Sequence, residues 1–186
     1  MPSIMMGLLD AKNIAAALVP HTSRDNITPV LTYICLGGNR GNYAYATDRY
    51  TVGRYDLTGI IIGEMPEEEF LIPAAVFSAI RSLGPATLAS GGHMQSNYRV
   101  VIETLEVGKL NYVQAKVLWH DDELGDMVHW MRTWTVPSRT IGNFPPVSRL
   151  FRGVKPGGSQ MNVGADQLTK FTGYAKHIRS TVRVTV

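Results

Sequence analysis

Apolar positions along this chain follow a helical period in some stretches and a strand period in others. Near the N-terminus, residues 11–20 are amphipathic, with Ile14 and Leu18 on one face. Asp10 stands where a helix cap is expected, and Pro20 stands where the helix should stop. The pattern therefore predicts a helix over 11–20.

A β-hairpin is predicted next, and its second strand contains charges. Residues 30–36 are apolar and β-prone, and the glycine-rich "GGNRG" after them is a tight-turn signal. The stretch 43–57, "YAYATDRYTVGRYDL", alternates like a strand until Asp48 and Arg49 interrupt it. A further strand is expected over 53–63, before an acidic turn.

The same order of elements then recurs. A short apolar strand over 70–73 leads through Pro73 into a helix over 74–84. Strands are expected over 86–90, 98–105, 109–119 and 127–136. A strand over 160–163, a helix over 164–178 and a last strand over 181–186 begin the pattern once more.

This recurrence predicts an α+β fold in which two strand–helix–strands units pack into one domain. Neither unit is large enough to bury its own apolar face, so each needs the other to complete a core. The expected arrangement is two helices on a sheet of about eight strands. The domain would cover 1–150, and 151–186 would be a linker and a partial third unit.

Composition excludes several classes of protein. Hydrophobic residues make up 45% and charged residues 18% of the 186 positions, which is typical of a globular domain. Cys35 is the only cysteine, which excludes an intrachain disulfide, and its apolar neighbours favour a buried thiol. The chain has no apolar run of about 18 residues and no secretory signal pattern, so we expect a cytoplasmic protein.

The charge distribution favours a polyanionic partner. The formal net charge is +3, and after Asp126 the only acidic residue is Asp166, whereas lysines and arginines are frequent there. The C-terminal third is therefore the candidate for contact with nucleic acid phosphates.

The sequence contains no motif with the residue order and spacing that are typical of a catalytic, metal-binding or cofactor-binding site. The acidic run "HDDELGDMVH" (120–129) lacks both the calcium-loop order and helical histidine spacing, so a solvated hairpin tip explains it better. "GGNRG" leads into a strand and not into a helix, which disfavours a phosphate loop. His21, Ser23 and Asp25 are too close in sequence for a typical triad.

Two tryptophans leave one alternative open. Trp130, Arg132 and Trp134 alternate along one predicted strand. On an exposed sheet they could stack nucleobases. Packing of both indoles against the core is the favoured alternative.

Five segments, in order, resemble the bacterial β sliding clamp family, the processivity factor of DNA polymerase III. "NYAYATDRYTVGRY" is similar to the family's A-T-D-G-H-R-L-A segment, and "TVPSRTIGNFPPVSRLF" to its F-P-D-Y segment. The other three are "DAKNIAAALVPHTSRDNITPVLTYICL", "EFLIPAAVFSAIRSL" and "MNVGADQLTKFTGYAKHI". The resemblance covers nearly the whole chain and is closest to the family's middle domain. It implies a clamp-domain fold over 1–150 and the start of a following domain.

The resemblance also implies a groove for partner peptides. When the family's groove positions are transferred one by one to this sequence, they fall on Thr47, Arg49, Tyr50, Thr51, Val52, Pro145, Arg149 and Leu150. Arg49 replaces the family's glycine and Pro146 its aspartate, which would reshape the groove. In the resemblance the strand ends at Asp48 because the chain leaves the sheet there.

Duplex DNA is the second implied partner, because in rings of this family helices face the DNA without reading its sequence. The candidate phosphate contacts are Lys12, Arg24, Arg81, Lys170, Lys176 and Arg179. The simpler alternative is an ordinary solvated helix face, which Lys12 or Arg81 alone would fit. The family closes its ring with six domains, whereas this chain has about one and a half, as in a fragment or a reduced, phage-type relative.

Three functions follow from these observations. The first is a non-enzymatic sliding clamp that holds a polymerase on duplex DNA without a metal or cofactor, with a homo-oligomer as the expected assembly. The second is a clamp-derived binding module that does not encircle DNA and interacts with replication proteins. The third is an α+β enzyme with a site that no motif reveals; a deep pocket with perturbed ionisable groups would favour it.

Overall fold

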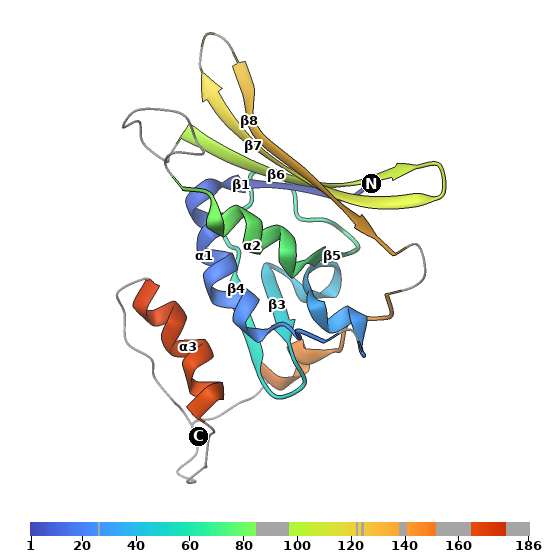
Figure 1. Cartoon of the computed structure of the whole chain (residues 1–186), viewed down its shortest axis with the longest axis vertical. Coiled ribbons are helices and arrows are strands. Elements are labelled where there is room, and N and C mark those ends of the chain that lie inside the picture. The colour runs from blue at the N-terminus through green and yellow to red at the C-terminus, as the bar shows by residue number, and fades with distance from the viewer. Residues whose placement is uncertain are drawn as a thin grey trace.

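The computed structural model describes residues 1–25, 27–84, 97–121, 123, 125–137, 141–151 and 165–177. Its strands form two four-stranded antiparallel sheets, and helices pack against them (Figure 1). The strands are β1 Ser3–Gly7, β2 Tyr33–Gly37, β3 Tyr43–Thr47, β4 Val52–Asp56, β5 Glu69–Pro73, β6 Tyr98–Val107, β7 Leu110–Asp121 and β8 Gly125–Val136. The α-helices are α1 Leu8–Leu18, α2 Ala74–Ser82 and α3 Ala165–His177. The α+β class is confirmed.

The two sheets exchange strands. One sheet has the order β1-β6-β7-β8 and the other the order β4-β3-β2-β5. Along the chain, the order strand, helix, three strands occurs twice, and the first strand of each run joins the three strands of the other run. The expectation of one continuous sheet is therefore wrong. Each meander acquires its fourth strand from the other half of the chain, so neither half completes its sheet alone.

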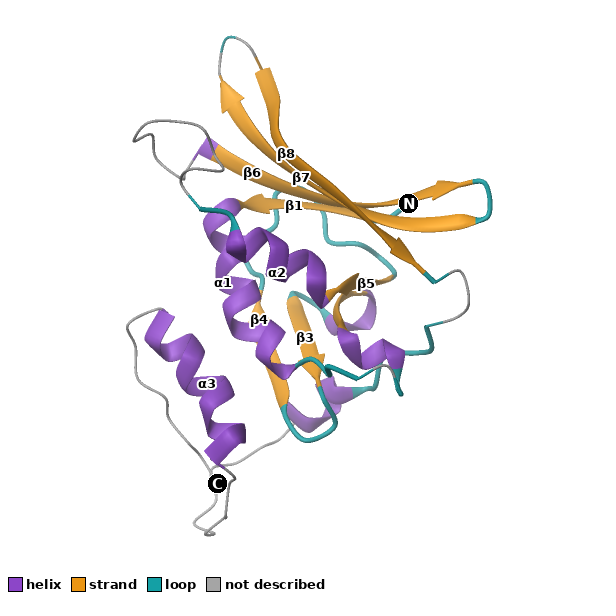
Figure 2. Ribbon diagram, viewed as in Figure 1, coloured by secondary structure: helices purple, strands orange, loops and turns teal. Residues whose placement is uncertain are grey.

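A single large core joins these layers. Helices α1 and α2 lie side by side and bury apolar side chains against both sheets (Figure 2). The helix predicted over 74–84 is present as α2, and one face of it is apolar and buried, with Val76, Phe77 and Ile80 followed by the buried Leu83. This packing supplies most of the apolar burial that stabilises such a fold.

The first helix begins earlier than predicted. Gly7 caps it, Leu8 is fully buried, and Asp10 lies within the first turn, where its charge still suits the helix dipole. The strand Ser3–Gly7 was not predicted. It has only five residues, and it forms because its backbone pairs with β6, with Ile4 opposite Ile102.

Two predicted strands are shorter in the structure. Pro29–Thr32 forms a 3₁₀ turn, so the strand predicted over 30–36 begins at Tyr33. The strand predicted over 53–63 ends at Asp56, because the Asp56 carboxylate accepts the Thr58 N–H at 2.9 Å and starts a turn. Among the residues of that predicted strand beyond Asp56, Ile61 makes an isolated β-bridge to Met6.

The later elements match the sequence pattern more closely. Strands β6, β7 and β8 form the predicted meander, with a bulge between Val117 and Leu118. Trp130 and Trp134 are partly buried against the core, so the core-packing interpretation is confirmed. The helix predicted over 164–178 is α3. The strands predicted over 86–90, 160–163 and 181–186, and Arg179, lie outside the described residues.

Candidate functional site

The turn between β3 and β4 is held by the carboxylate of Asp48. Its Oδ1 accepts the backbone N–H groups of Tyr50 at 3.1 Å and Thr51 at 2.8 Å, and the Thr51 hydroxyl at 2.9 Å. Arg49 has a φ of 81°, in the left-handed region that few residues other than glycine adopt. The charged residues that interrupt the strand pattern are thus turn residues. Asp48 accepts hydrogen bonds from backbone N–H groups of the turn that have no partner strand.

The threonines at either end of this turn are buried. The Thr47 hydroxyl donates to the Thr51 carbonyl at 2.8 Å and accepts the Arg49 N–H at 3.3 Å. By contrast, the Tyr50 side chain is 81% exposed, and the Arg49 guanidinium donates to the Thr28 hydroxyl. Within the predicted groove set, Thr47 and Thr51 therefore support the turn, and Arg49 and Tyr50 form its surface.

The second predicted groove segment packs beside β3 and β4. Phe144 and Val147 are buried in a small cluster with residues of β2, β3 and the 3₁₀ turn at Pro29–Thr32, and Val52 packs against that cluster. Pro145 is half-buried, whereas Arg149 and Leu150 are exposed on the 3₁₀ turn Val147–Phe151. Two segments about a hundred residues apart thus meet on the outer face of one sheet.

Helix α3 is tied to the turn by an ion pair. Lys170 donates to Asp48 Oδ2, and both side chains are largely buried. Burial alone would raise the pKa of Asp48, but hydrogen bonds from Lys170, Thr51 and Tyr50 outweigh it and lower the pKa. Asp48 is therefore an ionised carboxylate that serves both the turn and the helix.

His21 is the functional candidate that sequence reasoning missed. Its side chain is 2% exposed, its Nδ1 lies 3.0 Å from the Thr51 hydroxyl, and the Phe171 ring lies 4.6 Å away. Burial, and then the charge of Lys170, lower its pKa to about 4. Ser23 and Asp25 instead bond to each other locally, so the three do not form a triad. A histidine in a polar loop carries no sequence signal for such burial.

The predicted phosphate contacts differ in their surroundings. Lys12 donates to the Leu83 carbonyl at 2.7 Å, and Lys170 is paired with Asp48. Arg24, Arg81 and Lys176 are exposed. Arg24 and Lys170 line the same cavity of about 420 Å³, together with Pro20, Asp166 and Thr169. The structure therefore brings together two of the six predicted cations.

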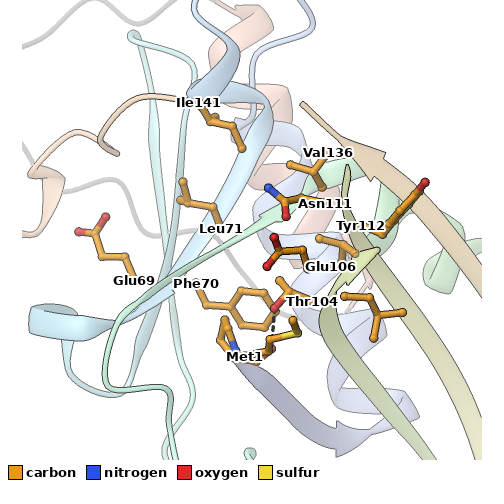
Figure 3. Close-up of a pocket in the computed structure, with 13 residues that line it drawn as sticks. Met1, Glu69, Phe70, Leu71, Thr104, Glu106, Asn111, Tyr112, Val136 and Ile141 are labelled. Atoms are coloured by element: carbon orange, nitrogen blue, oxygen red, sulfur yellow. Dashed lines mark hydrogen bonds between the residues drawn. The ribbon is translucent and has the colours of Figure 1, made fainter. Parts of the chain in front are cut away.

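Another hollow lies where β5 approaches the ends of β6, β7 and β8 (Figure 3). It has a volume of about 300 Å³, and the Phe70 ring points toward Met1 and Thr104. The Thr104 hydroxyl closes one side by donating to the Pro2 carbonyl at 3.4 Å. It contains none of the predicted groove residues.

The described residues of the acidic run at 120–129 lie at the β7–β8 hairpin, as predicted. His120 pairs with Asp126 across β7 and β8, with Nδ1 and Oδ1 2.7 Å apart. In the part of the chain that the structure describes, no group of three or more histidine, cysteine or acidic side chains is placed to hold a metal ion. Among the described helices, none has both the length and the apolar character needed to cross a membrane.

Comparisons with known proteins give one distant structural similarity. No family model matches the chain, and no curated protein matches it. Among solved structures, the chain is similar to DNA polymerase III subunit beta from Borrelia burgdorferi in complex with a natural product, with a TM-score of 0.42 and 12% identity. The match covers 73% of this chain and 47% of that one, so this chain spans about half the length of that protein.

Proposed function

We propose that this chain is a sliding clamp-like processivity factor, which associates with duplex DNA and tethers a replicative polymerase through a peptide-binding groove. The proposal combines the five-segment sequence resemblance with one structural observation. The two segments that the resemblance assigns to the groove, 47–52 and 145–150, pack on one face through Val52 and the cluster around Phe144. In this proposal the two strand–helix–strands runs form one clamp domain, and α3 belongs to a following, partial unit.

The groove has chemistry that suits a linear peptide. Tyr50 and Leu150 are apolar side chains exposed to solvent by 81% and 62%, and Arg149 is an exposed cation on the same turn as Leu150. Apolar residues of a peptide would cover the first two, and a polar or acidic residue would bind the guanidinium. The groove needs no metal or cofactor, and the proposed function is not enzymatic.

Titration of a fluorescently labelled clamp-binding peptide from a bacterial replicative polymerase tests the groove. Tyr50→Ala and Arg149→Ala should each weaken binding about tenfold, because each removes a contact worth about 1.5 kcal/mol. Arg81→Ala is the matched control, since Arg81 lies on α2 outside the groove and should leave affinity unchanged. Equal effects of Arg149→Ala and Arg81→Ala would reject a specific groove.

The alternative function, a clamp-derived binding module that does not encircle DNA, is favoured by one observation. Lys12 and Lys170, two of the six proposed phosphate contacts, are already engaged within the chain. Retention on nicked circular DNA, compared with the same DNA linearised, separates the two functions. A ring-forming clamp should stay on the circle and leave the linear molecule at about 200 mM salt, where simple electrostatic binding weakens. Equal release from both would favour the module.

A further inference from the structure

A third cavity lies between α1, the edge strand β4 and α3. Its volume is about 360 Å³, which is within the range of small-molecule sites. It is lined by Ala17, His21, Val52, Gly53, Arg54, Tyr55, Phe171 and Tyr174. Apart from Val52, none of these belongs to the proposed peptide groove, and none belongs to the proposed phosphate contacts.

The hydrogen bonds around His21 determine which ring nitrogen carries the proton. Asp48 is ionised and can only accept, so the Thr51 hydroxyl donates its one proton to Asp48 Oδ1 at 2.9 Å. The Thr51 oxygen is then the acceptor for His21 Nδ1, which must carry a hydrogen. Because the low pKa leaves the imidazole neutral near pH 7, Nε2 has a lone pair and no proton.

That lone pair has no partner within the described residues. The one hydrogen bond of the buried His21 side chain there is through Nδ1. Gly53 lies against the ring edge next to Nε2, and a Cβ on Gly53 would come within 2.7 Å of His21 Cδ2. A side chain at Gly53 would therefore collide with this edge of the imidazole, which lines the cavity together with Gly53. An acceptor atom without a protein partner can accept a hydrogen bond from a ligand donor.

The remaining walls are mostly aromatic, and the charged side chain among them is Arg54, whose guanidinium lies 4.7 Å from the centroid of the Tyr43 ring. The Phe171 ring tilts against His21, and the rings of Tyr55 and Tyr174 meet edge to face at 6.2 Å. The hydroxyls of Tyr55 and Tyr174 interact with each other, and both side chains belong to the cavity lining. The cavity lining contains no carboxylate, which disfavours a cationic ligand. Aromatic rings prefer such offset and edge contacts with another aromatic ring.

We propose that this cavity is a binding site for a neutral bicyclic aromatic ring with one N–H donor, of the indole class, whose N–H donates to His21 Nε2. Phe171 and the Tyr55–Tyr174 pair contact the ring, and the absence of a side chain at Gly53 gives it access to the imidazole edge. The ring comes either from a free indole-type small molecule or from a tryptophan side chain of a peptide. The site does not depend on the proposed clamp function.

Binding of indole and 1-methylindole to the full chain tests the site directly. Both ligands have the same ring, but 1-methylindole lacks the N–H. Titrations followed by ¹H–¹⁵N NMR should show indole binding about three- to tenfold more tightly, the value expected for one hydrogen bond. The shifts should centre on residues 17, 21, 53–55, 171 and 174, and the His21 Nε2 resonance should move with indole.

Two variants test whether the difference in affinity between indole and 1-methylindole depends on His21 Nε2. His21→Phe keeps a ring of similar shape but removes the acceptor, so the ratio of the two affinities should fall to about one. His129→Phe is the matched control, because His129 packs between Tyr98 and Trp119 on the sheet, and it should keep the wild-type ratio.

N-acetyltryptophanamide identifies the source of the ring. Binding of this compound at the same residues would indicate a tryptophan side chain, and binding of indole alone would indicate a free small molecule. Either result supports the site. Equal affinity of indole and 1-methylindole for the wild-type chain, absence of binding, or shifts centred elsewhere would overturn the proposal.

Discussion

Acid should destabilise this protein well above the pH at which its carboxylates titrate, because His21 is buried in a neutral form. Its folded pKa is about 4, against 6.5 for an exposed histidine. A depressed histidine pKa contributes stability that is fully present above the unfolded value of 6.5. That stability is lost as the pH falls through 6.5 toward 4, because the unfolded chain takes up a proton that the folded chain excludes.

The structure gives the size of this effect. A difference of about 2.5 pKa units corresponds to about 3.5 kcal/mol at roughly 1.4 kcal/mol per unit. The largest cause is burial of the imidazole, and the Lys170 charge adds to it. Asp48, whose pKa is also lowered, acts in a separate window, since its contribution is lost below its unfolded value of 3.8. Between pH 6.5 and 4.5 the histidine should therefore dominate the loss at this site.

Urea unfolding at pH 7, 5.5 and 4.5 measures this dependence. The wild-type free energy of unfolding should fall by about 2–3 kcal/mol over this range, and His21→Gln should remove most of that fall. Subtracting the profile of the variant cancels the contributions of the other histidines. If wild type and His21→Gln lose stability equally between pH 7 and 4.5, the assignment of a buried neutral imidazole is wrong.

Two further predictions concern the contacts around this turn. Asp48→Ala should cost more unfolding free energy than Lys170→Ala, by about 1–2 kcal/mol in urea denaturation, because Asp48 also accepts two backbone N–H groups; equal costs would contradict its role in the turn. Gly53→Ala should destabilise by about 1–3 kcal/mol, since its Cβ would come within 3.0 Å of Leu18 Cδ2. The control Gly173→Ala, in the open on α3, should stabilise by up to about 1 kcal/mol, and a lowered melting temperature there would be inconsistent with the helix.

Local pattern was sufficient for the elements with strong periodicity. The apolar face of α2, the long strands of the β6–β8 meander and the existence of α3 all follow from residues near one another in sequence. The predicted ends of helices and strands were less accurate where one side chain or one distant pairing partner determines where the element ends. The carboxylate of Asp56 ends β4 early, and the short strand β1 exists because β6 is available to pair with it.

The sequence by itself determined the α+β class and the repeated order of elements, and through the family resemblance it predicts groove residues at 47–52 and 145–150. Tertiary structure alone decided that the strands divide into two sheets with exchanged first strands, since strand pairing depends on backbone edges far apart in the chain. It also decided the chemistry of His21. The burial of His21, its tautomer and its unpartnered Nε2 depend on contacts among Asp48, Thr51, Lys170 and Phe171. These residues are far from His21 in the sequence, so no local pattern predicts the contacts.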